Sequence, residues 1–588
     1  MMNLREIALT SPFAAILVSF GLILGAFATD RYVSAEKDYG SGPNGEVKDG
    51  DLLYDTIQSA ITAAKTGETV WVKDGFVCET GGTSTKKNGF VCRVVIDKAI
   101  TLRSQSGEGR SGNPPIIKGD WANPDATCMD EAVGSGARRP LYVSVAATVL
   151  GFVIERGAAH TLNSDYSDYG GGGISGKLGT IEKCVIRNCY SGYGGGVHSP
   201  ASSTERLTLV DCVISNNVAQ YRGDGAWGAL TLKNCLVSGN GYDPNTAKKK
   251  GSGGVSGKSD TVRILVEGCV ISNNTTVGSG GGATWANISK GSCIVGNTAS
   301  TSGGGANSST LNDTEVCLNK VTNTHASGGA GGGLLSCVAT NCVISGNTAQ
   351  IGGGVSGGTT VNCYLANNRG RGHGGGVCLT STANLCIGCT VVSNTAVQWG
   401  GGLYVSVDKA AFYNCLVAWN VQDANSGIGA SGVCGEWTSA ASTRKYARLV
   451  NCTVVSNWFN SGTNSRAGTS QCDLVNTIVW GNLNANGRAS NADATRSAVN
   501  SCAPELSDTT KYPGCITSDP KFRRGCVYQI GPRSPRRATG AILTDDAVFS
   551  SMQKDIDGNP RFGEKDGVTT IDMGCCQYAP FGLMMLVK

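Results

Sequence analysis

A basic turn near the middle of the chain holds the first side chains whose spacing suggests chemistry. Arg369, Arg371 and His373 lie within five residues of one another. An arginine beside a bound uronate can remove the proton next to the carboxylate, while Ca²⁺ or nearby cations neutralise the carboxylate itself. The turn therefore makes a polysaccharide lyase one candidate activity. A solvated basic turn without a catalytic role is the simpler interpretation.

Carboxylates are missing where a glycoside hydrolase would need them, because hydrolysis requires two across the scissile bond. The 92 residues from 316 to 407 contain no Asp or Glu. Oxygen ligands for Ca²⁺ are offered only by two loose acidic loops, Asp165 with Asp168, and Asp120 with Asp125 and Asp130. We assign no catalytic residue and no metal ligand, and expect no cofactor unless a lyase needs Ca²⁺.

Tryptophans gather in the last third of the chain and indicate carbohydrate binding, because exposed indole faces suit sugar rings. We predict that the binding residues are Trp399, Trp419, Trp458 and Trp480. The last three lie close to a recurring asparagine in consecutive repeats, so we expect them along one edge of the molecule. Packing beneath an insertion at 422–444 is the alternative.

Composition indicates a repeat protein. Of 588 residues, 85 are glycine and 25 are cysteine, and 49 Lys+Arg against 44 Asp+Glu give a net charge of +5. This near balance gives no reason to expect a nucleic-acid partner. A Cys-aliphatic-x-aliphatic pattern recurs, and nine of its eleven steps span 21–28 residues. Its members start at Cys184, Cys212, Cys235, Cys269, Cys293, Cys317, Cys342, Cys363, Cys389, Cys415, Cys452 and Thr477.

Each repeat predicts one coil of a parallel β-solenoid. An aliphatic residue stands two positions after the cysteine, asparagine stands five positions after it in nine of twelve repeats, and a glycine cluster follows. Short alternating runs separated by glycine and asparagine are typical of strands joined by tight turns. We expect the asparagines to stack, each in the left-handed conformation that its turn requires. The predicted fold is all-β, a β-helix closed by caps at both ends.

A short helix is expected to close the N-terminal end, because Ile57, Ala60, Ile61 and Ala64 form one apolar stripe that ends before Gly67. The segments 56–60, 67–75 and 96–102 resemble the start of bacterial right-handed parallel β-helix proteins. The C-terminal end resembles choice-of-anchor β-helix proteins, through Asp519-Pro520-Lys521-Phe522, Ser534-Pro535 with Gly540, Asp557-Gly558-Asn559-Pro560-Arg561 and Ile571-Asp572-Met573-Gly574. The resemblance implies a right-handed helix with the pectate-lyase-like fold, in a secreted or surface protein.

The first 28 residues are typical of a secretory signal peptide, with Arg5 before an apolar run and Ala26-Phe27-Ala28 at the cleavage site. We expect an extracellular or outer-surface protein that spans no membrane after the signal is removed. The predicted organisation is a signal at 1–28, an N-terminal cap with the first coils at 29–180, the β-helix at 181–500 and a C-terminal cap at 501–588.

The repeat cysteines are expected to form an inward column of free thiols, because in-register side chains fit disulfide geometry badly. Outside the column, Cys78 and Cys92 are candidates for one disulfide, and Cys502, Cys515 and Cys526 for another. The spacings match no zinc site. The residue after each repeat cysteine is apolar in ten of twelve repeats. This second column should point outward, as a docking surface or beneath the protein's own segments.

These features favour an exported scaffold that binds glycans or a cell-surface component. A lyase acting on uronic-acid polymers is the alternative. A passenger domain released from a larger secretion system is a third possibility.

Overall fold

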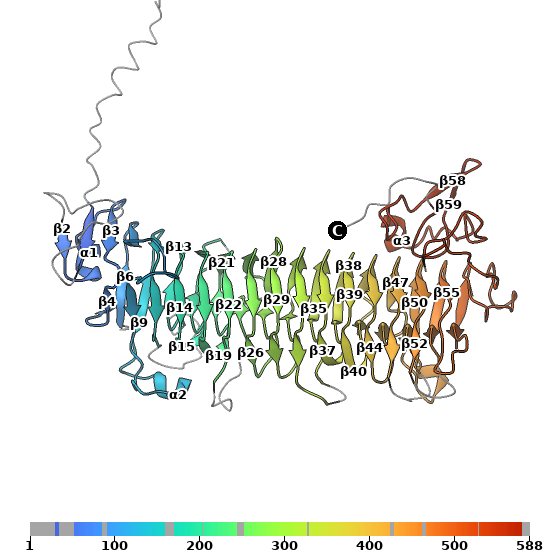
Figure 1. Cartoon of the computed structure of the whole chain (residues 1–588), viewed down its shortest axis with the longest axis horizontal. Helices are drawn as coiled ribbons and strands as arrows, with labels where there is room; N and C mark the ends of the chain where they lie inside the picture. The colour runs from blue at the N-terminus through green and yellow to red at the C-terminus, as the bar shows by residue number, and fades with distance from the viewer. Residues whose placement is uncertain are drawn as a thin grey trace, which may run out of the picture.

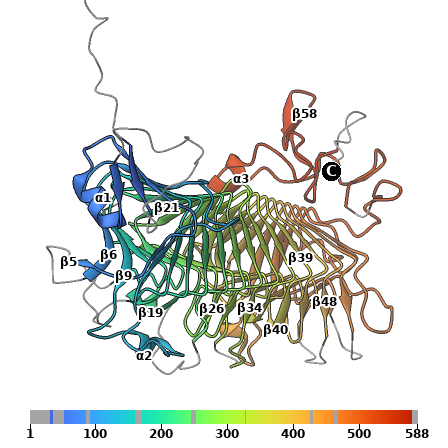
Figure 2. The ribbon, with the colours of Figure 1, turned by 60° about the vertical axis from the view of Figure 1, so that its left-hand side comes forward.

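The computed structural model describes residues 30–34, 52–84, 91–158, 170–202, 204–243, 252–325, 328–423, 429–460, 466–526 and 528–578. Within these ranges the chain forms a right-handed parallel β-helix, a rod of stacked coils with a cap at each end (Figure 1). Figure 2 shows the coils lying one behind another along the rod. The signal peptide expected at 1–28 lies outside the described residues.

Three parallel sheets run along the rod, and each coil contributes to them in turn. A 32-stranded sheet takes two strands from most coils, as in β27 (Ala283–Thr284) and β28 (Ala286–Ser289), or one long strand, as in β35 (Leu334–Thr340). It begins at β1 (Arg31–Val33) and ends at β57 (Ser497–Val499).

A narrow 15-stranded sheet forms the second face of the rod. Its strands are β4 (Val77–Cys78), β8 (Ile116–Lys118), β11 (Val153–Glu155), β14 (Val185–Arg187), β18 (Val213–Ser215), β22 (Leu236–Ser238), β25 (Val270–Ser272), β29 (Cys293–Val295), β33 (Glu315–Cys317), β36 (Val343–Ser345), β39 (Tyr364–Ala366), β43 (Thr390–Val392), β47 (Leu416–Ala418), β51 (Thr453–Val455) and β55 (Ile478–Trp480).

An eight-stranded sheet forms the third face over the later coils. Its strands are β26 (Thr275–Thr276), β30 (Thr298–Ala299), β34 (Lys320–Val321), β37 (Thr348–Ile351), β40 (Arg369–His373), β44 (Thr395–Ala396), β48 (Val421–Gln422) and β52 (Trp458–Phe459). Over earlier coils, β15 (Tyr190–Tyr193) and β19 (Val218–Arg222) pair separately.

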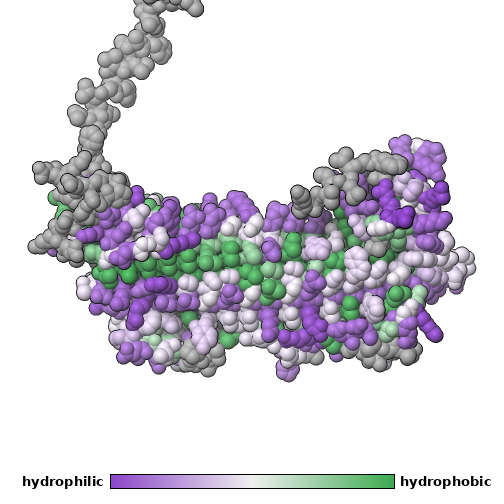
Figure 3. Space-filling model, viewed as in Figure 1, coloured by the Kyte–Doolittle hydropathy of each residue, from purple (hydrophilic) through white to green (hydrophobic). Residues whose placement is uncertain are grey.

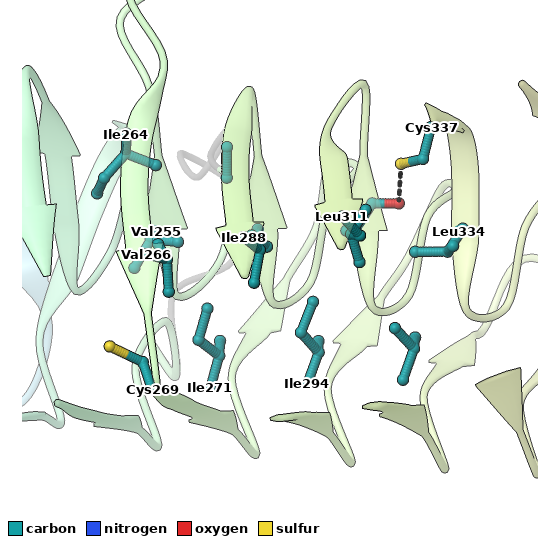
Figure 4. Close-up of a cluster of buried hydrophobic side chains, with 14 of the residues drawn as sticks. Val255, Ile264, Val266, Cys269, Ile271, Ile288, Ile294, Leu311, Leu334 and Cys337 are labelled. Carbon is teal, nitrogen blue, oxygen red and sulfur yellow. Dashed lines mark hydrogen bonds between the residues drawn. The ribbon is translucent and has the colours of Figure 1, made fainter. Parts of the chain in front are cut away.

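Aliphatic side chains fill the inside of the rod as one continuous core. Figure 4 shows part of this core, where Val266 and Ile271 of one coil and Ile294 of the next coil point inward. The repeat cysteine and the aliphatic residue two positions later both face this interior, as at Cys212 and Ile214, which are fully buried. The predicted inward column is therefore confirmed.

The prediction of an inward side chain is wrong for two cysteines of the column. Cys293 pairs with Val270, and Cys317 pairs with Val295, so both lie on outward positions of the narrow sheet. The inward positions of these coils are occupied by Ser292 and Thr314, whose hydroxyls bond to backbone carbonyls within the rod. In these two coils the inward position lies one and three residues before the cysteine.

Buried asparagines form an unbroken ladder along the turn between the narrow and the eight-stranded sheets. In each step the side-chain Nδ2 donates to Oδ1 of the next asparagine at 2.8–3.2 Å. The members are Asn217, Asn240, Asn274, Asn297, Asn319, Asn347, Asn368, Asn394, Asn420, Asn457, Asn482 and Asn491. The predicted stacking is confirmed and extends to Asn297, Asn319 and Asn491.

The left-handed residue of this turn is the one before each ladder asparagine, contrary to our expectation. It is Asn216, Asn273 or Asn367 in three coils, and glycine at 239, 296, 346 and 481 in four others. The ladder asparagines themselves do not have positive φ, because their side chains need the geometry that stacks them in register.

The ladder ends on a carboxylate. Asn491 donates its backbone N–H and its Nδ2 to Oε1 of Glu505, at 2.9 and 3.4 Å. Every ladder amide points its N–H toward this end, so aligned bonds polarise one another and partial positive charge collects there. A carboxylate, which only accepts hydrogen bonds, closes the ladder at its donating end.

The caps seal both ends of the rod. Helix α1 (Ile57–Ala63) begins at Thr56, whose hydroxyl accepts from Ser59 N, and buries Ile57, Ala60 and Ile61 as predicted. Short helices α2 (Met129–Ala132) and η3 (Ala441–Thr443) lie in loops. At the C-terminal end, Ala503, Leu506 and Tyr512 join the core. The rest of the C-terminal segment contains α3 (Ala547–Ser551) and the antiparallel pair β58 (Gly563–Lys565) and β59 (Val568–Thr570), and it packs on the side of the rod, where Phe549 lies in a cluster with Tyr413 and Val450. No helix among the described residues is long and apolar enough to cross a membrane.

The interior thiols are predicted to be chemically inert in the folded protein. All 25 cysteines, including Cys78, Cys92, Cys502 and Cys515, are free in the structure. Burial raises the pKa of Cys184 and of Cys337 to about 12, so almost no thiolate forms at pH 8. Iodoacetamide should label the partly exposed Cys526 but not these two, as read by peptide mass spectrometry. Equal labelling of Cys184 and Cys526 in the native protein would contradict this.

Candidate functional site

The outer face of the eight-stranded sheet brings two predicted groups of residues together. Strand pairing aligns Arg369 with Thr395, Thr395 with Val421, and Val421 with Trp458. Alternate residues point into the rod, since Gly370, Ala396, Gln422 and Phe459 are buried. Arg369 of the basic turn and Trp458 therefore share one outward surface, a relation that spacing along the chain did not reveal.

Trp419 and Trp458 are the exposed aromatic side chains of this surface. Their exposed fractions are 47% and 51%. They come from adjacent coils and flank the ladder asparagines Asn420 and Asn457. Trp458 also bridges to Leu483, which is 38% exposed. Two flat apolar faces beside a polar row are an arrangement that suits sugar rings.

Trp419 occupies the left-handed position of its turn, with φ of +55°. This conformation is costly for a bulky side chain, and such strain tends to persist at functional sites. Most equivalent positions hold Gly, Asn or Ser; Leu318 and Arg156 are the other bulky exceptions among the described coils.

Polar side chains beside the tryptophans form a short network. Arg369 Nη1 lies 3.0 Å from Asp423 Oδ2, and Asn460 Nδ2 donates to Asp423 Oδ1 at 3.2 Å. Because Arg369 and Asp423 are partly exposed, this pair adds little to stability. It presents both donors and acceptors to solvent. We call Trp419, Trp458, Arg369, Asp423 and Asn460 the tryptophan face.

His373 does not belong to a cationic cluster with the two arginines. Its ring stacks on Trp399 at 4.7 Å and on Tyr404 at 4.9 Å. Burial lowers the pKa of His373 to about 4, so the imidazole is neutral at pH 7. The structure gives Arg371 no ion pair with a described residue.

The other two predicted tryptophans lie elsewhere. Trp399 is half-buried against His373, at the turn that leads from the eight-stranded sheet into the 32-stranded sheet. Trp480 pairs with Val455 on the narrow sheet and packs against the clusters that hold Cys575 and Met573. The expectation of a single row is wrong for Trp480, because this residue lies on a strand of the narrow sheet two residues before Asn482, where the C-terminal segment partly covers it. A role of either residue in binding stays a prediction.

The predicted outward apolar column runs along the narrow sheet (Figure 3). Leu236, Val270, Val343 and Tyr364 are 36–47% exposed. Toward the C-terminal end the chain covers its own column, where Leu416 packs against Cys575 and Cys576, and Ile478 packs against Met573. Ile294, which we expected to point outward, is fully buried, because its coil was aligned on Cys293. Docking of a partner on the exposed part stays a prediction.

The acidic loops do not assemble a calcium site in the described residues. Asp120 forms ion pairs with Arg93 and Arg138, and Asp165 and Asp168 lie outside the described residues. Asp555, Asp557 and Cys576 lie close enough to share an ion. However, the Asp555 carboxylate already accepts from the backbone N–H groups of Asp557, Asn559 and Gln577, so it serves to hold a turn.

No known protein family matches the sequence, and no curated protein matches it. Among solved structures, the chain is similar to the Dettilon tailspike protein, at 11% identity and a TM-score of 0.30. The match covers 67% of this chain and 64% of the tailspike, so the chain spans less than two thirds of that protein.

Two further solved structures are similar at low scores. For pectate lyase Pel9A the identity is 11%, the TM-score is 0.22, and the match covers 94% of this chain and 98% of the lyase. For the A-module of Azotobacter vinelandii mannuronan C-5 epimerase AlgE6 the values are 14% and 0.22, with 79% and 94% covered. The parallel strand pairing of the chain itself defines its fold.

Proposed function

We propose that this chain is an exported scaffold that binds glycans through its tryptophan face. The observation that carries the proposal is the pair of half-exposed indoles, Trp419 and Trp458, beside a hydrogen-bonded row of Arg369, Asp423 and Asn460. Sugars combine apolar ring faces with hydroxyl groups, and this surface offers a partner for each. Export rests on the signal-peptide pattern of residues 1–28.

The dimensions of the face suit an oligosaccharide better than a single sugar. Arg369, Thr395, Val421 and Trp458 lie on four consecutive strands. At about 4.8 Å per strand, the row is about 14 Å long. A ligand lying along the rod axis would contact the indoles, Asp423 and Asn460 at one end and the strand of Arg369 at the other.

Binding should depend on the two tryptophans. We expect Trp458→Ala to weaken affinity for the best oligosaccharide of a glycan array by about tenfold, as is typical for an aromatic anchor. Trp419→Asn should weaken it similarly without lowering Tm, because asparagine accepts the left-handed backbone at this position. Isothermal titration calorimetry measures affinity, and thermal unfolding measures Tm.

Tyr364→Ala is the matched control for these variants. Tyr364 has the same exposed fraction as Trp419, 47%, but lies on the narrow sheet. Its loss should leave affinity unchanged. If no glycan binds, or if all three variants bind as the unaltered protein does, the proposal fails.

A lyase acting on uronic-acid polymers is the second candidate, and the position of Arg371 favours it. Arg371 lies two residues from Arg369 on the same strand of the tryptophan face, and the structure pairs it with no described acidic residue. Incubation with acidic polysaccharides and Ca²⁺ should then produce unsaturated uronides that absorb in the ultraviolet. Product that disappears with Arg371→Ala would replace the scaffold proposal by a lyase.

A further inference from the structure

A polar groove lies on a different face of the rod from the tryptophan face, on the outer side of the 32-stranded sheet. It has a volume of about 440 Å³ and runs across four consecutive coils. Its lining residues are Asp260, Arg263, Trp285, Ser308, Ser309, Thr310, Ser336 and Val338. We call it the Trp285 groove.

Trp285 adopts a conformation that its neighbours in the same column adopt with small side chains. Strand pairing places Trp285 in register with Gly257 on one side and with Ser308, then Ser336, on the other. Trp285, Ser308 and Ser336 all have positive φ, of 47–49°. A serine or glycine meets this backbone requirement more easily than an indole does. The bulky ring is therefore kept at a position whose turn does not favour it.

The surroundings hold the indole in place. Arg222, from β19, stacks on the Trp285 ring with its guanidinium carbon 4.2 Å from the ring centroid. This contact covers one side of the ring, so a ligand in the groove meets its remaining side or its edge. The nearby turn is fixed by Arg206, whose Nη1 donates to the carbonyl of Arg263 at 2.9 Å.

The groove carries hydrogen-bonding groups of both kinds and little net charge. Asp260 and Arg263 form an ion pair, in which the Asp260 side chain is 71% exposed and that of Arg263 is 23% exposed. Arg263 Nη1 also donates to Thr310 Oγ1 at 3.4 Å, so the guanidinium spans the groove wall. The hydroxyls of Ser308 and Ser336 lie on the same column as the indole.

We propose that the Trp285 groove binds a neutral hexose unit of an oligosaccharide. A sugar ring offers an apolar face to the indole and hydroxyl groups to Asp260, Arg263 and the serine and threonine hydroxyls. The balance of Asp260 against Arg263 favours a neutral ligand over a uronate. The groove lies on another sheet from the tryptophan face, so this proposal does not depend on the function proposed above.

The test measures binding of neutral hexose pentasaccharides, with uronic-acid pentasaccharides as the charged comparison, by calorimetry on the full chain. Trp285→Ser replaces the indole by serine, the residue at the equivalent positions 308 and 336 of the next two coils. It should reduce affinity for a neutral pentasaccharide at least tenfold and leave Tm unchanged or higher. Asp260→Asn keeps the exposed side chain's shape and should reduce affinity several-fold.

Trp458→Ala separates the two sites. In this variant, binding to the Trp285 groove should persist with unchanged affinity, even if the tryptophan face binds nothing. The proposal is overturned if no neutral pentasaccharide binds, if uronic-acid pentasaccharides bind more tightly at this groove, or if both Trp285→Ser and Asp260→Asn bind normally. If Trp285→Ser lowers Tm, affinity of Asp260→Asn decides the question.

Discussion

Replacing Asn368 with alanine is expected to lower the free energy of unfolding by roughly 2–6 kcal/mol. Oδ1 of Asn368 accepts from both the backbone N–H and Nδ2 of Asn347, each at 3.0 Å. The substitution leaves the Asn347 backbone N–H and one of the two Nδ2 hydrogens without an acceptor, at a cost of roughly 1–3 kcal/mol each, while the other Nδ2 hydrogen still bonds to the Val316 carbonyl. The Ile344 carbonyl and Oδ1 of Asn394 each lose a donor as well.

The neighbouring asparagine supplies a matched control. Asn367 is exposed, makes no ladder bond and has φ of +56°, a conformation that glycine adopts freely. Asn367→Gly should therefore change stability by less than about 1 kcal/mol. Urea denaturation followed by circular dichroism measures both variants. Equal effects at the two adjacent positions would show that the ladder bonds contribute nothing particular.

Replacing Arg561 with alanine is expected to release the segment around Met573, Cys575 and Cys576, which covers the C-terminal part of the outward apolar column. Arg561 is fully buried, and its Nη2 donates to the carbonyls of Asp572 and Gly574 at 3.0 and 2.7 Å. Hydrogen bonds from a charged donor contribute roughly 1.5–3 kcal/mol each, so the expected loss is about 3–6 kcal/mol. The segment carries Cys575 and Cys576, which pack on the apolar column.

Thiol labelling reports this release directly. Cys575 and Cys576 are 0% and 3% exposed, and should react with iodoacetamide at least ten times faster in Arg561→Ala than in the unaltered chain. Arg561→Met keeps most of the buried volume without the donors, so its labelling rate should fall between the two. Unchanged labelling in Arg561→Ala would mean that the segment is held without this arginine.

Periodic features of the fold were predictable from the sequence, because each coil repeats the same local requirements. The inward position, its aliphatic partner and the ladder asparagine recur at fixed offsets, so even Asn217 and Asn482 could be assigned from the pattern. The register failed at Cys293 and Cys317, where serine and threonine replace the inward cysteine. The intact offset to Asn297 and Asn319 was the signal that would have corrected it.

Contacts between distant segments were not predictable in the same way. Nothing in the repeat indicates that Cys575 and Met573 would cover Leu416 and Ile478, because that packing joins residues about a hundred positions or more apart. The Trp285 groove was missed for a similar reason, since it depends on a loop at 260–263 lying against coils that follow it. In the structure, the groove is marked by Trp285, the one bulky residue in a column where Ser308 and Ser336 have the same positive φ.

The asparagine ladder also bears on how a rod of this kind acquires its length. Each internal asparagine accepts on one side and donates on the other, so a duplicated coil inserted between two others meets matching groups at both of its surfaces. The number of coils can then change by gene duplication, because an added coil makes the same asparagine hydrogen bonds as its neighbours. Glu505 differs, because a carboxylate can receive the final donors but offers none to a following coil. The asparagine ladder therefore ends at Glu505, and a further coil could not continue it beyond this residue.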